Sequence, residues 1–401
     1  MAPEEEISPE AHSAPIDFSI FGAPRHAPLA RPTSREVVGL REGKMGVSKA
    51  PTGQRRLTRG DLTGKAQTVL GIVDPARLGA TLMHEHVLWD LRKGEARLKN
   101  DLGPEITLKN HYAIWYGEQY SPRNAQLDDV VLAIEEVNLM KEAGGQTLVE
   151  LTCGGLRPDP KGLADVSIGT GVGIVMGCGY YVEEYQDPKN HDRSIDDFAA
   201  EMATQVLEGA WGTDIRAGMI GEIGCQSPWT DLERRVMEGA ILAQQETGAA
   251  INVHPGRDPD QPQEGADFIV EHGGDIERVV ISHIDRTIFD ADRMLKLADT
   301  GCVLEFDLFG RETSLYTASD IDMPNDALRV QHIRMLIDRG HLDRVVISHD
   351  ICQQIRLRNF GGHGYGHIFR NVLPLMRRRG FTEAEIQAIL VDTPRRLLTF
   401  A

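Results

Sequence analysis

The sequence predicts an α/β fold, a (β/α)8 TIM barrel built by one domain that follows an N-terminal extension. From residue 64 onward, eight short runs rich in apolar and β-branched residues alternate with longer amphipathic segments. Several runs are apolar nearly throughout, as expected for strands covered on both faces. A doubly wound sheet is the rival fold. Its G-x-G-x-x-G turn after the first strand is absent from this sequence.

Composition narrows the class of protein. The chain has 401 residues, of which 41% are hydrophobic, and a formal net charge of -17. Such an acidic chain disfavours nucleic acid and anionic membranes as partners, so we expect a small-molecule substrate. A homodimer is a candidate assembly. Five cysteines without a C-x-x-C pair, no apolar stretch long enough for a membrane span and no secretory signal together favour a cytoplasmic protein.

The first 60 residues differ from the rest. They are rich in Pro, Ala, Arg and Ser and lack apolar periodicity, which predicts a mobile or loosely docked extension. Met45 lies inside this segment and is an alternative natural start. Residues 61–401 form the predicted barrel domain.

The predicted strands follow one another along this domain. They cover residues 80–83, 147–151, 172–176, 218–223, 250–253, 279–282, 302–306 and 345–348. The long first loop, residues 91–127, carries several aromatic residues and is long enough to act as a lid over a site.

Helical patterns separate the strands. Asp128 and Asp129 open one that ends before Gly144, and Thr230 with Glu233 forms a capping box for another that runs to Gly248. Further helices are predicted at residues 194–207, 326–340 and 382–390. Thr393-Pro394 has the form of an N-cap followed by proline at the first helical position, which predicts one more helix start.

The first strand ends in two histidines separated by one residue. Side chains at i and i+2 of a strand point to the same face, so His84 and His86 can aim both imidazoles at one point while Glu85 points away. Imidazole is a common ligand of zinc-like metals. The alternative is a strand end that carries two histidines by coincidence.

Other strands also end in ligand types. In a barrel of this kind functional residues lie at the C-terminal ends of the strands. The fourth strand carries Glu222, the fifth ends in His254, the sixth in His283 and the eighth in Asp350. Together with the first pair, this set exceeds one tetrahedral zinc and fits two divalent ions about 3.5–4 Å apart that share a carboxylate and a hydroxide.

Two neighbouring residues are alternatives to members of this set. Glu150, at the end of the second strand, is the rival bridging carboxylate, although Glu222 lies on a strand opposite the first. His349 is adjacent to Asp350 and should point the other way, so it is excluded.

The chain resembles the amidohydrolase superfamily and, within it, the phosphotriesterase family. The resemblance spans most of residues 64–400, through the His-x-His strand and the segments GKAQTVLG (64–71), IGEIGC (220–225), HPGR (254–257), SHIDRT (282–287), LEFDLFG (304–310), DIDMP (320–324) and GGHGY (361–365). The extension before residue 60 falls outside it. Well-known members bridge their metals with a carboxylated lysine, whereas Glu222 fits the glutamate-bridged branch.

The resemblance implies two divalent metal ions, zinc first and manganese or cobalt as alternatives. His84, His86 and Asp350 would hold the buried ion, and His254 and His283 the more exposed one. The implied activity is hydrolysis by a metal-bridging hydroxide, with Asp350 as the catalytic proton acceptor. The implied substrate is an N-acyl amino acid or N-acyltaurine type amide. Lactone or phosphotriester (organophosphate) hydrolysis is the alternative, and a non-catalytic small-molecule binder is the alternative of another class.

Candidate substrate contacts lie just beyond the ligand positions. Arg257 and Arg286 each follow a ligand histidine, and a planar guanidinium suits a carboxylate or sulfonate. Bracing of the loops is the alternative role of each arginine. Tyr180 with its neighbour Tyr181, after the third strand, and Tyr365, in the eighth loop, are candidates to line the pocket or to pack.

Overall fold

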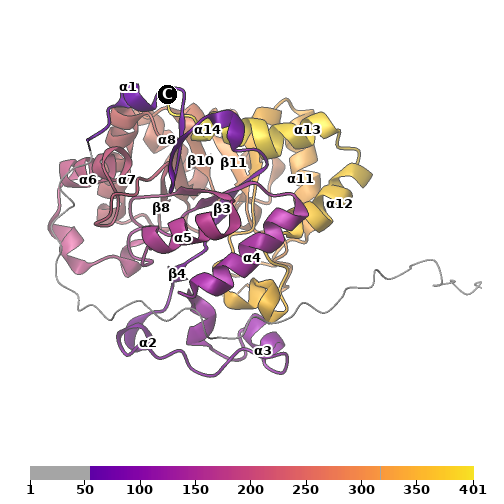
Figure 1. The fold of residues 1–401 in the computed structure, drawn as a ribbon. Helices are drawn as coiled ribbons and strands as arrows, with labels where there is room; N and C mark the ends of the chain where they lie inside the picture. Colours follow the sequence, from indigo (N-terminus) through magenta and orange to yellow (C-terminus); the bar gives the residue numbers. More distant parts are fainter. Residues whose placement is uncertain (1–54, 317) are drawn as a thin grey trace, which may run out of the picture. The chain divides into compact units, whose positions relative to one another are not determined.

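The structure, a computed structural model, describes residues 55–316 and 318–401. Parallel strands form its centre and helices lie outside them (Figure 1), which confirms the predicted TIM barrel. The barrel strands, in spatial order, are β3 (Thr81–Glu85), β6 (Thr147–Glu150), β7 (Gly173–Met176), β8 (Ile220–Gly224), β9 (Ile251–His254), β10 (Val279–Ile281), β11 (Val303–Phe306) and β12 (Val345–Ile347).

Two seams close the barrel. Strands β3, β6 and β7 pair as one group and β8 to β12 as another. The N–H of Gly218 donates to the carbonyl of Met176 at 2.9 Å, and the N–H of Asp350 donates to the carbonyl of His84 at 3.1 Å. The second of these bonds brings Asp350, three residues after the last strand, to the end of the first strand. Closure of the barrel therefore brings together the candidate metal ligands of the first and the last strand.

The barrel interior is a packed core at the level below the strand ends. Inward-facing residues from alternate strands fill it, as the barrel architecture requires. These fully buried side chains include Met83, Val149, Val175, Met219, Val280, Val303 and Val346. The polar side chains described below lie above this layer, at the C-terminal ends of the strands.

The helices follow the predicted order. They are α1 (Arg59–Leu62), α2 (Gly94–Leu98), α3 (His111–Trp115), α4 (Val130–Ala143), α5 (Pro160–Thr170), α6 (Ile195–Leu207), α7 (Asp231–Thr247), α8 (Gln261–Glu271), α9 (Ile284–Thr287), α10 (Ala291–Ala298), α11 (Asp326–Asp338), α12 (Leu373–Arg378), α13 (Glu383–Gln387) and α14 (Thr393–Leu398). The capping box at the start of α7 is confirmed: the Glu233 N–H donates to Thr230 Oγ1 at 3.2 Å, and the helix ends at Gly248 in the left-handed region.

One predicted helix start, at Thr393, is wrong. Thr393 does not cap a new helix, because Asp392 and Thr393 both have right-handed helical backbones and α13 continues into α14. The connecting segment, Ala388–Asp392, is a π-helical turn. Such a turn accommodates Pro394, which has no N–H to donate to a regular helical ladder.

Two short strand pairs were not predicted. β1 (Ala66–Thr68) and β2 (Gly71–Val73) form a hairpin, and β4 (Trp89–Asp90) pairs antiparallel with β5 (Gln126–Leu127). The second pair joins the two ends of the long first loop. Figure 1 shows the helices of this loop, α2 and α3, beyond β4 and away from α1 and α14. His111 of this loop lies 3.1 Å from the carbonyl of Ile355 in the eighth loop.

Most of the predicted extension, including Met45, lies outside the described residues. The described part begins at Arg55, and Leu57 donates a backbone hydrogen bond to the carbonyl of Leu207 at 2.9 Å. Arg56 pairs with Glu208 and Glu246. Within the described ranges, every helix is too short or too polar for a bilayer crossing.

Candidate metal centre

The two histidines of β3 face the interior of the barrel mouth. His84 and His86 are 0% and 2% exposed, and their ring centroids lie 5.5 Å apart. Glu85 points to the other side, where its carboxylate accepts hydrogen bonds from Ser348 and from the backbone of His349. The alternation of side chains along a strand therefore places the two imidazoles together, as the His-x-His spacing predicts.

Glu222 lies at the centre of the cluster. Its Oε1 is 3.4 Å from His86 Nε2, and its Oε2 is 3.6 Å from His84 Nε2. The same Oε2 lies 2.8 Å from His254 Nδ1 and 3.7 Å from His283 Nε2. One carboxylate thus approaches imidazoles from three separate strand ends, which is the geometry a bridging ligand requires.

The imidazoles of β9 and β10 meet each other on the second side of Glu222. His254 Nδ1 and His283 Nε2 are 2.8 Å apart. His283, two residues after the end of β10, has a left-handed backbone with φ of 56°. This turn directs its ring into the barrel mouth rather than onward along the strand.

Asp350 completes the cluster on the first side. Its Oδ1 lies 3.1 Å from His86 Nε2 and 3.8 Å from His84 Nε2. Its side chain is 13% exposed, more than the carboxylate of Glu222 at 2%. Asp350 is therefore the acidic member of the cluster that remains accessible from outside.

The donor atoms fit divalent cations. Nε2 of His84 is buried and has no hydrogen-bond partner among the described residues, which is costly unless a cation binds it. Three groups of side chains have ligand atoms within 4.8 Å of one another, and all contain His84: the first adds Glu222 and His283, the second His86 and Asp350, and the third Glu305 and Asp307. The first two use His84 together with predicted ligands, whereas the third lies on the Nδ1 side of its ring. Imidazole nitrogens and carboxylate oxygens are the ligands that zinc and related metals accept.

Electrostatics favour an ionised Glu222 and a neutral His254. Burial alone would raise the pKa of Glu222, but the charges of His254 and His84 lower it well below its usual range. Burial lowers the pKa of His254 to about 3, against the opposing effect of Glu222 and with the support of His283. An ionised carboxylate beside a neutral imidazole presents free lone pairs to a cation.

Sequence reasoning missed the groups that hold the ligand rings. Asp307, after β11, has Oδ1 at 2.8 Å from His283 Nδ1 and Oδ2 at 3.2 Å from His84 Nδ1. Thr152 Oγ1 lies 2.9 Å from His86 Nδ1. Burial would lower the pKa of His283, but Asp307 raises it to about 9. Asp307 could have been predicted, because functional residues of a barrel follow the C-terminal ends of its strands and the seventh predicted strand ends at residue 306.

The two alternative residues have other partners. Glu150 accepts hydrogen bonds from the N–H groups of Val87 and Thr152 at 3.1 and 3.3 Å, and belongs to none of the three groups. His349 turns away from the cluster, with Nδ1 beside Glu85 and Nε2 accepting from the N–H of Ile368. The carboxylates that lie among the candidate ligand imidazoles are therefore those of Glu222 and Asp350.

Three of the predicted substrate contacts point away from the pocket or donate their hydrogen bonds to backbone carbonyls. Arg286 is 4% exposed and donates to the carbonyls of Pro255 and Gly256, so it braces that loop. Tyr180 donates to Glu201, and Tyr365 is buried and donates to the carbonyl of His86 at 2.6 Å.

Arg257 and Tyr181 face the mouth of the cluster instead. They line a cavity of about 690 Å³, which also exposes His254. The Tyr181 hydroxyl lies 3.4 Å from His254 Nε2. Gly224 permits this approach, because a Cβ there would lie 2.1 Å from the backbone nitrogen of Val182. Arg257 Nε donates to the Tyr316 hydroxyl at 3.3 Å, and the guanidinium carbon lies 5.7 Å from the centroid of that ring. Among the described residues, its two terminal NH2 groups have no hydrogen-bond or ion-pair partner.

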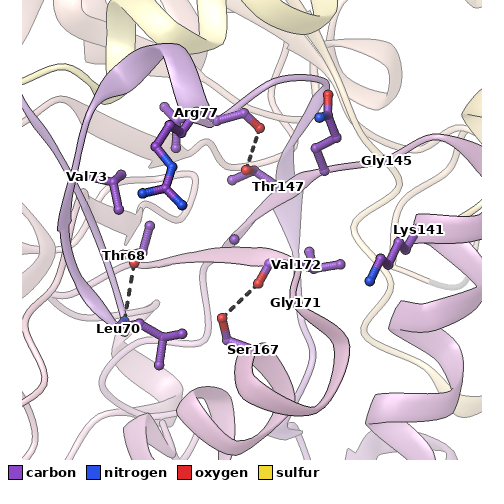
Figure 2. Close-up of a pocket in the computed structure, with 13 residues that line it drawn as sticks. Thr68, Leu70, Val73, Arg77, Lys141, Gly145, Thr147, Ser167, Gly171 and Val172 are labelled. Carbon is purple, nitrogen blue, oxygen red and sulfur yellow. Dashed lines mark hydrogen bonds between the residues drawn. The ribbon is translucent and has the colours of Figure 1, made fainter.

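A second hollow, of about 420 Å³, lies at the opposite end of the strands (Figure 2). Figure 2 shows Thr147 and Ser167 turned to backbone carbonyls, and Lys141 Nζ donates to the carbonyl of Thr170 at 2.6 Å. Neither histidine nor carboxylate lines it. Groups at this end of a barrel support stability, so this hollow is separate from the metal centre.

Comparisons with known proteins agree with the geometry. The sequence model of the phosphotriesterase family matches residues 64–398. The phosphotriesterase-related protein of Nematostella vectensis is 40% identical over 84% of this chain and 99% of its own length. The N-acetyltaurine hydrolase of Bos taurus is 41% identical, with the same coverage. The crystal structure of a resiniferatoxin-binding protein from Rhodobacter sphaeroides superposes with a TM-score of 0.79 at 33% identity, over 86% of this chain and 98% of that one.

Proposed function

The chain belongs to the phosphotriesterase family, and we propose that it hydrolyses small N-acyl amides with an anionic tail, of the N-acyltaurine or N-acyl amino acid type. Its standing as a metal-dependent hydrolase of this family, predicted from the sequence, is confirmed by the similarity to named hydrolases over nearly their full length. The substrate class, the roles of the metal ligands and the identity of the metal are proposals.

The observation that carries the substrate class is the free guanidinium fork of Arg257. It opens into the same cavity as His254, in a chain whose net charge is -17. A planar guanidinium with two free NH2 groups suits bidentate binding of a carboxylate or a sulfonate. An anionic substrate would otherwise be repelled by so acidic a protein. The similarity to N-acetyltaurine hydrolases supports an amide whose tail is a sulfonate.

Six side chains are proposed to hold two divalent ions. His84, His86 and Asp350 would bind one, His254 and His283 the other, with Glu222 shared. Zinc is proposed because imidazole dominates the set, with manganese or cobalt as alternatives. Bound there, the ions supply the Lewis acidity that makes water a nucleophile near neutral pH.

The remaining steps fall to residues of the chain. Asp350, as the accessible carboxylate, accepts the proton that the attacking water loses and returns it to the amide nitrogen. Hydrolysis consumes one water, breaks the C–N bond and releases a carboxylic acid and an amine. Tyr181 holds the His254 ring so that Nδ1 faces Glu222, and Arg257 fixes the tail of the substrate.

Two further proposals follow from composition. A small-molecule substrate rather than nucleic acid is supported by the net charge of -17. A cytoplasmic location is supported by the five cysteines, all of which are unpaired. The homodimer remains a prediction.

A substrate panel tests the function. Purified protein loaded with zinc would be assayed with N-acetyltaurine, N-acetyl amino acids, a lactone and the phosphotriester paraoxon. We expect the highest kcat/KM for an N-acyl amide with an anionic tail, and about two metal ions per chain by elemental analysis. Preference for the lactone or paraoxon would replace the proposed substrate. Absence of turnover with every compound would favour a non-catalytic binder.

A further inference from the structure

Arg356 is a fully buried arginine without a carboxylate partner among the described residues. It is 0% exposed, and the acceptors of its three side-chain hydrogen bonds are neutral, although the charges of Asp350 and Glu85 act on it from farther away. One terminal NH2 donates to the carbonyl of Asp350 at 2.6 Å, and the other to the carbonyl of His349. Nε donates to His363 Nε2 at 3.3 Å. A buried guanidinium usually pairs directly with a carboxylate, so the attachment of Arg356 to these two carbonyls requires an explanation.

The backbone that Arg356 binds has an uncommon conformation. Asp350 has φ of 50°, in the left-handed region that residues with a Cβ rarely adopt. Its N–H donates to the carbonyl of His84 on the neighbouring strand. A residue in this conformation persists only where its surroundings fix it, and the direction of the Asp350 carboxylate depends on it.

Glu85 binds the same segment from the other side. Its Oε1 accepts from the backbone N–H of His349 at 3.0 Å, and its Oε2 from the N–H of Ile351 at 3.2 Å. Glu85 is also fully buried and stands between the two histidines of β3. The amides of this segment are thus bound by Glu85 and β3, and its carbonyls by Arg356.

We propose that Arg356 is a positioning residue that sets the direction of the Asp350 carboxylate toward His84 and His86, with Glu85 as its counterpart on the amide side. Arg356 does not line the cavity that exposes His254, so it acts through Asp350 rather than on substrate. The inference rests on the role proposed above for Asp350.

The test compares Arg356→Met and Arg356→Lys with a matched control, Arg278→Met. Arg278 also donates to three carbonyls, those of Arg396, Leu397 and Thr399, but away from the metal centre. Zinc affinity would be measured by competition with a chelating dye, the geometry of the centre by the visible spectrum of the cobalt-loaded protein, and folding by Tm. Kinetic constants would be measured with N-acetyltaurine.

For Arg356→Met we expect zinc affinity to fall about 10- to 100-fold, as for other groups that orient metal ligands. The cobalt spectrum should change, and kcat should fall more than KM rises. Arg356→Lys should lie between the wild type and the methionine variant, because one ammonium cannot reach both carbonyls and His363. Arg278→Met should lower Tm and keep both zinc affinity and cobalt spectrum.

Wild-type zinc affinity and cobalt spectrum in Arg356→Met would overturn the proposal, whatever the change in Tm. If that variant fails to fold, the lysine variant decides by the same two measurements. If the wild type does not hydrolyse N-acetyltaurine, the proposed substrate fails, but the zinc and cobalt measurements still decide the role of Arg356.

Discussion

Asp307 binds His283 through both its backbone and its ring. The backbone N–H of His283 donates to Oδ2 at 3.0 Å, and His283 Nδ1 lies 2.8 Å from Oδ1. One carboxylate therefore fixes the left-handed turn after β10 and the rotation of the imidazole together. Because Oδ2 also lies 3.2 Å from His84 Nδ1, the same group orients histidines that are proposed to bind different ions.

Asp307→Asn should weaken the metal centre. An amide has a donor NH2 where one carboxylate oxygen now accepts, so it cannot satisfy His283 and His84 at once. We expect zinc affinity to fall about 10- to 100-fold, measured by competition with a chelating dye. Glu136→Gln is the matched control, because Glu136 is equally buried but binds the backbone of Arg358 and Asn359. Equal losses in both variants would contradict a specific role for Asp307.

Glu222→Gln should remove the shared ligand. The change keeps the volume and places an NH2 group among imidazoles that lie within 4 Å of the carboxylate. We expect the metal content to fall from about two ions per chain toward one, and kcat to fall on the order of 100-fold or more. Elemental analysis and steady-state kinetics measure these effects. Glu150→Gln should retain both ions; the opposite pattern would make Glu150 the bridge.

Arg257→Met should discriminate between charged and neutral substrates. A hydrogen bond to a charged group contributes roughly 1.5–3 kcal/mol, so KM for N-acetyltaurine should rise about 10- to 100-fold. KM for the neutral N-acetylethanolamine should change little. Arg234→Met is the control, because Arg234 lies over Trp229 and pairs with Glu264 outside the cavity lining. An equal rise in KM for both substrates would show that Arg257 does not bind the tail.

Glu150 should make stability depend on pH. Burial raises its pKa from 4.5 to about 7, against opposing effects of His86 and of the N–H groups of Val87 and Thr152. The folded state therefore keeps a proton that the unfolded state has lost, so this contribution is present below pH 4.5 and disappears as the pH rises through 7. The loss should be on the order of 3 kcal/mol relative to Glu150→Gln.

Urea unfolding of both proteins at pH 5, 6, 7 and 8, at one total zinc concentration, measures this effect. The wild type should lose free energy of unfolding relative to the variant across that range. A constant difference would mean that the Glu150 carboxyl group titrates in the folded state as it does in the unfolded chain.

Local patterns predicted the order of the barrel elements. The apolar runs that became β3, β6 and β7 were recognisable because a strand buried on both faces needs apolar residues throughout. The capping box of α7 was recognisable because Thr230 and Glu233 satisfy each other within one turn. The prediction of a helix start at Thr393 was wrong because it used only the residues Thr393-Pro394. The π-helical turn before Thr393 depends on how α13 and α14 pack.

The sequence by itself determined which side chains stand at the mouth of the barrel. Alternation along a strand and the common direction of parallel strands place His84, His86, Glu222, His254 and Asp350 at one end, whatever the details of packing. The resemblance to the phosphotriesterase family came from the same segments, which supply the ligands and the turns that follow them.

Only the tertiary structure decided what holds these side chains and which neighbours face the substrate. Asp307 contacts ligand residues that follow or end other strands, His283 and His84. Arg356 turns back onto the backbone of His349 and Asp350 in its own loop, and no helical or strand period predicts that turn. Tyr181 rather than Tyr180 faces His254, because the close approach of the third loop to Gly224 sets the rotation of that segment. Contacts at 3 Å depend on how distant segments pack, and that packing is a property of the whole barrel.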